Sequence, residues 1–193
     1  SGLLAIHTRE MKTKLTPLLA FLIMGTTLPA AKFSLGKKEV VAFVGGTDVG
    51  RAQEDGSLEA MLTHAFVRQE PIFRDMSWDA DTVYRQGSVI ERWRKNGFGD
   101  RVEQLKREKV SMVISCFGRL ESMDGEERLD DFAQAYDRLI DDYLKQARQV
   151  VVVAPLAFEK PSNHLLPDPT IHNQDLSLYV AKMREMSRRR NLV

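Results

Sequence analysis

The sequence predicts an α/β domain in which helices cover both faces of a parallel sheet. Short apolar segments alternate along the chain with segments whose apolar residues recur every three or four positions, so strands alternate with helices. Two of the expected strands, 110–117 and 149–155, are apolar without alternation. Such runs are typical of strands buried on both faces. The predicted architecture therefore has three layers, α/β/α.

Each expected element follows from its local pattern. The first strand, 39–44, is a β-rich apolar run that ends in two glycines, and Leu58 begins an i, i+3, i+4, i+7 helical stripe that ends at Ala65. A shorter or edge strand is expected at 71–75, followed by a surface helix at 100–109 and the strand 110–117. A long amphipathic helix from Leu129 to Tyr143 and the strand 149–155 come next. After a loop, the last expected helix has an apolar stripe of Leu176, Tyr179, Val180 and Met183.

Composition excludes several classes of function. The 193 residues suit one domain, and 43% hydrophobic residues are enough for a packed core. The net charge of +1 gives no reason to expect a nucleic-acid partner. The only cysteine, Cys116, rules out an internal disulfide and a multi-cysteine zinc site, and its apolar neighbours favour a buried strand cysteine over a reactive thiol. We expect no cofactor and no metal.

The N-terminal segment has the pattern of an export signal. Lys12 and Lys14 precede an apolar stretch at 15–28, and small residues follow at 29–31. We therefore expect an upstream segment at 1–10, a signal peptide at 11–31, and a secreted or periplasmic domain at 32–193. The alternative is that the apolar stretch is an uncleaved membrane anchor.

Three loops follow the first three strands, at 45–50, 77–83 and 118–123. Ligands of parallel α/β sheets bind at the carboxyl ends of the strands. These loops are therefore the expected borders of one site.

In this order, "FVGGTDV", "FRDMSWDADTV" and "SCFGRLES" resemble the consensus blocks of the SGNH (GDSL-type) hydrolase superfamily, over residues 39–193. The phrases "WDADTV", "FGRLES" and "PLAFEKP" are most similar to GDSL-like domains of large secreted planctomycete-type proteins, where further propeller or haem-binding modules can follow. The resemblance implies a flavodoxin-like three-layer fold and hydrolysis of ester bonds.

The resemblance assigns roles to three positions, each of which carries a residue that differs from the family's. Thr47 occupies the position of the nucleophilic serine, and Gly46 precedes it where the family has aspartate. Ala80 corresponds to the glycine whose amide donates to the oxyanion, and any positive φ there would cost energy. Leu120 replaces the asparagine that donates to the same oxyanion, and losing one such donor typically slows catalysis by about a hundred- to a thousand-fold. Glu121 and Ser122 are the neighbours able to reach that space.

The Asp-x-x-His block of the family is not found in the chain. Asp168 and His172 have the wrong spacing, and we expect His172 and His164 to be surface loop residues. By this resemblance, the last strand and the Asp-x-x-His block are expected after Val193.

Four further residues near the expected site are candidates for substrate binding: Gly46, Asp48, Trp78 and Asp81. Three of these residues also have a purely structural interpretation. Asp48 lies where acidic groups suit a helix dipole, Trp78 can cover the core instead of stacking on a sugar, and Asp81 can cap a helix.

Two functions remain open from the sequence. The first is hydrolysis of a carbohydrate or other small-molecule ester. The second is a non-catalytic cleft that binds a glycan or docks a neighbouring module through Trp78, Asp81 and Glu121. An adaptor without a ligand is a weaker third interpretation.

Overall fold

The computed structural model describes residues 32–84 and 99–193. The expected upstream segment, 1–10, and the expected signal peptide, 11–31, lie outside the described residues and stay predictions, as do further modules. No helix within the described ranges is both long enough and apolar enough to cross a bilayer.

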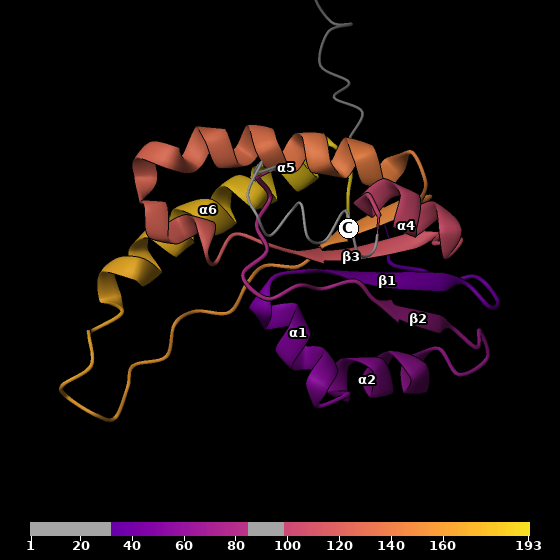
Figure 1. Ribbon diagram of the computed structural model, residues 1–193, viewed down its shortest axis with the longest axis horizontal. Helices are drawn as coiled ribbons and strands as arrows, with labels where there is room; N and C mark the ends of the chain where they lie inside the picture. Colours follow the sequence, from indigo (N-terminus) through magenta and orange to yellow (C-terminus); the bar gives the residue numbers. More distant parts are fainter. Residues whose placement is uncertain (1–31, 85–98) are drawn as a thin grey trace, which may run out of the picture.

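Four parallel strands form the sheet in the order β2-β1-β3-β4, which confirms the predicted fold class (Figure 1). They are β1 (Val40–Gly45), β2 (Ile72–Asp75), β3 (Met112–Cys116) and β4 (Gln149–Val152). Val41 of β1 pairs with Phe73 on one side and with Met112 on the other. The two central strands are almost fully buried, whereas β2 is largely exposed, as expected of an edge strand.

Helices cover both faces of this sheet. The helices α1 (Thr47–Glu54) and α2 (Ser57–Ala65) lie on one face, and α4 (Arg101–Arg107), α5 (Leu129–Leu144) and α6 (Thr170–Arg189) lie on the other (Figure 1). The 3-10 turns η1 (Glu121–Asp124) and η2 (Glu126–Arg128) connect β3 to α5. Alternate β1 residues enter the two separate cores: Ala42 packs toward α5, and Phe43 packs toward α1 and α2.

The helical stripe expected from Leu58 to Ala65 is α2, and a separate helix, α1, precedes it. Gly56 separates α1 from α2 with a left-handed φ of 67°, a conformation that glycine adopts without strain. Leu58 and Leu62 pack against the core as expected, but Met61 is 63% exposed, so the buried stripe of α2 is narrower than its sequence indicates.

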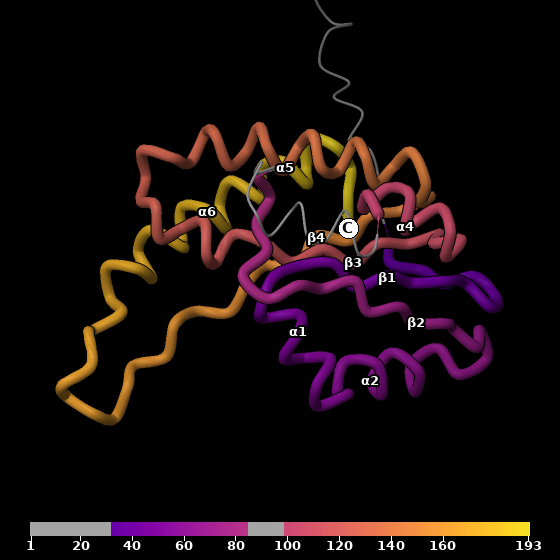
Figure 2. The backbone as a smooth tube through the Cα atoms, in the orientation of Figure 1, coloured from indigo at the N-terminus to yellow at the C-terminus, as the bar shows by residue number. Residues whose placement is uncertain are grey.

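The last helix begins earlier than its apolar stripe. Asp168 Oδ1 accepts a hydrogen bond from the Thr170 amide (2.9 Å), so α6 starts at Thr170 and His172 lies on the helix, not in a loop as expected. The segment between β4 and α6 extends away from the sheet (Figure 2). After α6, the Val193 carbonyl oxygen accepts from the Val152 amide of β4 (2.9 Å).

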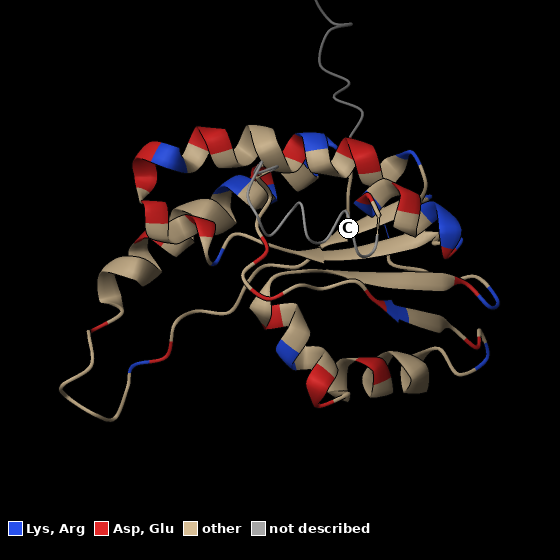
Figure 3. Cartoon of the chain, viewed as in Figure 1, with Lys and Arg blue, Asp and Glu red and all other residues tan. Residues whose placement is uncertain are grey.

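Charges of both signs are interspersed on the outer helices (Figure 3). Arg190, the residue that follows α6, forms ion pairs with Asp137 and Asp141 of α5 and so links these two helices. The interspersion fits the near-zero net charge.

Gly45, at the end of β1, is required by the close approach of β3. A Cβ on this residue would lie 2.4 Å from the Cys116 carbonyl oxygen and 2.5 Å from Val49 Cγ2. Both distances are too short for real contacts, so only glycine fits where β1 turns into α1.

Gly45→Ala should lower the free energy of unfolding by about 3 kcal/mol, because the backbone of β3 would have to move. Gly50→Ala, inside α1, is the matched control. Its Cβ would meet nothing closer than 3.6 Å, and alanine in a helix interior should raise stability by roughly 0.5–1 kcal/mol. Urea unfolding measures the free energy of unfolding of both variants. Equal changes in the two variants would contradict the packing argument.

Candidate active site

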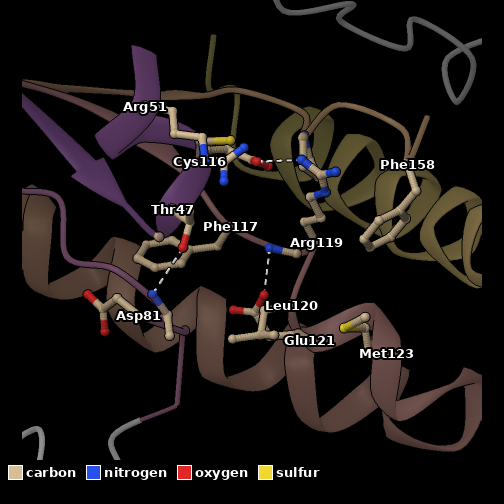
Figure 4. Close-up of a pocket in the computed structure, with 15 residues that line it drawn as sticks. Thr47, Arg51, Asp81, Cys116, Phe117, Arg119, Leu120, Glu121, Met123 and Phe158 are labelled. Carbon is tan, nitrogen blue, oxygen red and sulfur yellow. Dashed lines mark hydrogen bonds and ion pairs between the residues drawn. The ribbon is translucent and has the colours of Figure 1, made fainter. Parts of the chain in front are cut away.

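A cavity of about 260 Å³ lies at the carboxyl end of the sheet, where ligand sites of parallel α/β folds are found. All four post-strand segments contribute to it (Figure 4). Its lining consists of Gly46, Thr47, Asp48, Arg51, Ala80, Asp81, Cys116, Phe117, Gly118, Arg119, Leu120, Glu121, Met123, Pro155 and Phe158. The structure therefore brings Thr47, Ala80 and Glu121 around one cavity.

Thr47 and Ala80 face each other directly. Thr47 is the first residue of α1, so its amide has no acceptor within the helix, and the helix dipole favours negative charge in front of it. The Ala80 amide donates a hydrogen bond to Thr47 Oγ1 (3.2 Å). Both side chains are exposed. The Ala80 amide thus points at the threonine hydroxyl, which lies at the N-terminus of α1.

Ala80 has a left-handed φ of 58°. The resemblance aligns it with a glycine, and only glycine adopts this conformation without cost. The Ala80 amide therefore reaches Thr47 Oγ1 from a backbone conformation that is strained for alanine.

The close approach of the second loop leaves no room for a side chain at residue 46. A Cβ at this position would lie 2.9 Å from the carbonyl oxygen of Asp81, so the second loop passes directly over the residue before Thr47. Any side chain at residue 46 would push that loop, and Ala80 with it, away from the threonine.

Glu121 is a buried residue that links two loops through hydrogen bonds. Its Oε1 accepts from the Val83 amide and its Oε2 from the Gly118 amide, both at 2.8 Å, and the residue is 2% exposed. Burial raises the pKa of this carboxyl above its usual value, and the nearby Asp81 adds to that rise, whereas the backbone hydrogen bonds oppose it. Glu121 therefore holds two loops together, and its oxygens are occupied as acceptors.

The third oxyanion donor of the family has no replacement among these side chains. Leu120 lines the cavity with 43% of its surface exposed and has nothing to donate. Ser122 is fully buried, and its hydroxyl donates to the Arg119 carbonyl oxygen (2.8 Å). The expectation that Ser122 can reach the oxyanion is therefore wrong.

Asp48 and Arg119 form an ion pair of 2.6 Å between the first and third loops (Figure 4). The Arg119 guanidinium also lies over the ring of Phe158, 4.5 Å from its centroid. The Asp48 carboxylate therefore positions a cation that in turn fixes an aromatic wall of the cavity.

Asp81 lines the cavity but is held from outside it. Its Oδ2 accepts from Arg101 of α4 (2.6 Å), and its Oδ1 accepts from the Thr82 amide (3.1 Å). Residues 81–84 are not helical, so the helix that Asp81 was expected to cap does not begin there. Trp78 is not among the residues that line the cavity, so its predicted contact with a ligand has no support here.

The sequence did not indicate two arginines of the cavity or the aromatic residue that follows β4. Arg51, Arg119 and Phe158 all line the cavity. Arg119 lies in the third of the expected loops, whereas Arg51 lies on α1, just after the first, and no sequence pattern distinguishes either of them. Phe158 follows β4. Ligands of parallel α/β sheets bind at the carboxyl ends of the strands, so the segment after the fourth strand was as good a candidate as the three loops before it.

The nucleophile and base candidates elsewhere in the described chain are less favourable. Cys116 is 9% exposed, and burial, with the nearby carboxylates of Asp48 and Glu121, raises the pKa of its thiol to about 12. Cys116 is therefore the inert buried cysteine that its sequence context predicts. None of His64, His164 and His172 lines the cavity. Within residues 32–84 and 99–193, no cluster of three or more His, Cys, Asp or Glu is placed to hold a metal.

The chain matches no protein-family model and no curated protein. It is similar to several solved structures. One described as a GDSL-like lipase, from Parabacteroides merdae, has a TM-score of 0.60 and 12% identity over 84% of this chain and 79% of that one. Axe2, an acetylxylan esterase from Geobacillus stearothermophilus, has a TM-score of 0.58 and 14% identity over 83% and 76%. LAE5, an α/β hydrolase from the metagenome of Lake Arreo, has a TM-score of 0.55 and 15% identity over 82% and 76%.

These identities are low, so the likeness establishes the fold alone. The chain has an α/β/α fold of the SGNH hydrolase type, as the order of its three loop motifs predicts.

Ala80→Gly should raise the free energy of unfolding by up to about 1 kcal/mol, because glycine relieves the left-handed strain at this position. Ala60→Gly, on an exposed position of α2 with ordinary helical backbone, is the matched control and should lose about 1 kcal/mol. Urea unfolding distinguishes the two. A loss at position 80 as large as that at position 60 would contradict the strain.

Proposed function

We propose that this domain acts on ester bonds outside the cytoplasm, with Thr47 as the nucleophile and the Thr47 and Ala80 amides as oxyanion donors. The observation that carries the proposal is the 3.2 Å contact between the Ala80 amide and Thr47 Oγ1 at the mouth of the cavity. A hydroxyl, a helix N-terminus and a second-loop amide converge there, and acyl transfer needs a nucleophile beside oxyanion donors.

In the proposed reaction, Thr47 Oγ1 attacks the ester carbonyl carbon and its proton passes to a base. The carbonyl oxygen becomes an oxyanion, and the Ala80 amide exchanges its bond to Thr47 for a bond to that oxygen. The intermediate expels the alcohol, which takes up the proton. Water then attacks the acyl-threonine, releasing the acid and restoring the hydroxyl.

One observation favours a second candidate, a domain that binds esters or related carbonyl compounds without turning them over. Leu120 supplies no third donor, and no histidine from the described ranges lines the cavity to serve as the base. The hydrolytic proposal therefore requires a base other than the described histidines, whereas the binding proposal needs only the groups already present.

Turnover of p-nitrophenyl acetate by the full chain and by its Thr47→Ala variant tests the nucleophile. We expect release of p-nitrophenol above the buffer rate, and a loss of about a hundredfold or more in kcat/KM for Thr47→Ala. Thr63→Ala is the matched control, because Thr63 is exposed on α2 and lies outside the cavity lining.

The outcomes separate the two candidates. Equal rates for wild type and Thr47→Ala would remove Thr47 from the mechanism. If neither protein exceeds the buffer rate, the wild-type chain is titrated with acetate and its backbone amide shifts are followed by NMR, which shows whether the site binds a carboxylate. Shifts of the Thr47 and Ala80 amides would support binding alone, and unchanged amides would overturn both candidates.

A further inference from the structure

One wall of the cavity is apolar and open. Leu120 and Met123 come from η1 and the residue before it, and 43% and 50% of their surfaces are exposed. Phe158, from the segment after β4, lies across from them (Figure 4). Exposed apolar side chains that gather in a concave site usually contact an apolar ligand group.

The aromatic side of this slot is held in place by its surroundings. Asn173 of α6 clamps the Phe158 backbone, with its Oδ1 accepting from the Phe158 amide (2.8 Å) and its Nδ2 donating to the Phe158 carbonyl oxygen (2.9 Å). Arg119 covers one face of the ring, and Asp48 fixes Arg119. The ring is therefore preorganised before any ligand arrives, which lowers the entropy cost of binding.

The charged groups around the slot are largely occupied by protein partners. The Asp48 carboxylate pairs with Arg119, the Asp81 carboxylate pairs with Arg101, and both Glu121 oxygens accept from backbone amides. A sugar ring presents several hydroxyl groups that need partners, and this wall supplies few. An apolar chain needs none.

We propose that the slot formed by Leu120, Met123 and Phe158 binds an apolar acyl chain longer than acetyl. The inference rests on the proposed function in one respect, since it places the ester carbonyl at Thr47. Leu120, which stands where the motif it resembles has an oxyanion-donating asparagine, thus contributes to the choice of substrate. The substrate class is an ester of a medium-length alkyl acid, not an acetylated carbohydrate.

Binding of the product acids tests the slot independently of catalysis. Acetate and hexanoate carry the same carboxylate and differ by four methylenes. Each buried methylene strengthens binding about fourfold, which is about 0.8 kcal/mol, so hexanoate should bind the full chain on the order of a hundredfold more tightly. Calorimetric titration measures both. Equal affinities would overturn the proposal.

Two variants localise the effect. Leu120→Asn and the nearly isosteric Met123→Gln should each reduce the preference for hexanoate to about tenfold or less. Leu165→Asn is the matched control, because Leu165 is 79% exposed on the segment before α6 and does not line the cavity. An unchanged preference in both cavity variants would overturn the slot, and melting temperatures confirm that each variant is folded.

Turnover of p-nitrophenyl acetate and p-nitrophenyl hexanoate on the same samples separates this proposal from the proposed function. A binding preference for hexanoate without hydrolysis of either ester would support the slot and reject hydrolysis. Hydrolysis of both esters with equal kcat/KM, together with equal binding of the two acids, would support hydrolysis and reject the slot.

Discussion

The candidate site depends on one buried carboxylate. Glu121 accepts hydrogen bonds from the Gly118 amide in its own loop and from the Val83 amide in the loop after β2. Burying a carboxylate is costly, and two charge-assisted hydrogen bonds offset much of that cost. Beyond the end of β2, the Met76 and Trp78 amides still donate to carbonyl oxygens of β1, so the sheet positions the start of the loop that follows. Glu121 holds the end of this loop at Val83, three residues after Ala80, and so helps to keep Ala80 beside Thr47.

Gly46, Ala80 and Leu120, three of the residues at which the sequence differs from the motifs it resembles, fit together physically. With Gly46 before the nucleophile position, the second loop comes close enough for the Ala80 amide to reach Thr47 Oγ1, and the left-handed backbone of Ala80 aims that amide. Across the cavity, Leu120 replaces a donor with apolar surface beside Phe158. If the proposed function holds, the Thr47 and Ala80 amides are the oxyanion donors and Leu120 contributes an apolar contact instead of a third one.

The sequence predicts the scaffold better than the site. The unbroken apolar runs of β3 and β4 and the wide stripe of α5 determine layers and order, because burial alone decides them. The role of Glu121 was not predictable, since its partners are backbone amides that carry no sequence signal. Phe158 is positioned by Asn173, fifteen residues away, and only the tertiary fold brings them together. The exposure of Met61 depends on how α2 is oriented on the sheet, and the left-handed turn at Gly56 sets where this helix begins.

Hydrogen exchange at the Val83 and Gly118 amides tests the central claim most directly. In the wild-type chain both amides should exchange slowly, because both donate to a buried carboxylate. In Glu121→Gln the new side chain has one acceptor oxygen and one amide group, so at least one of the two should exchange tenfold faster or more. The Met76 amide, which donates to the Phe43 carbonyl oxygen, should not change. Fast exchange of both amides in the wild type, or unchanged exchange in the variant, would contradict the account.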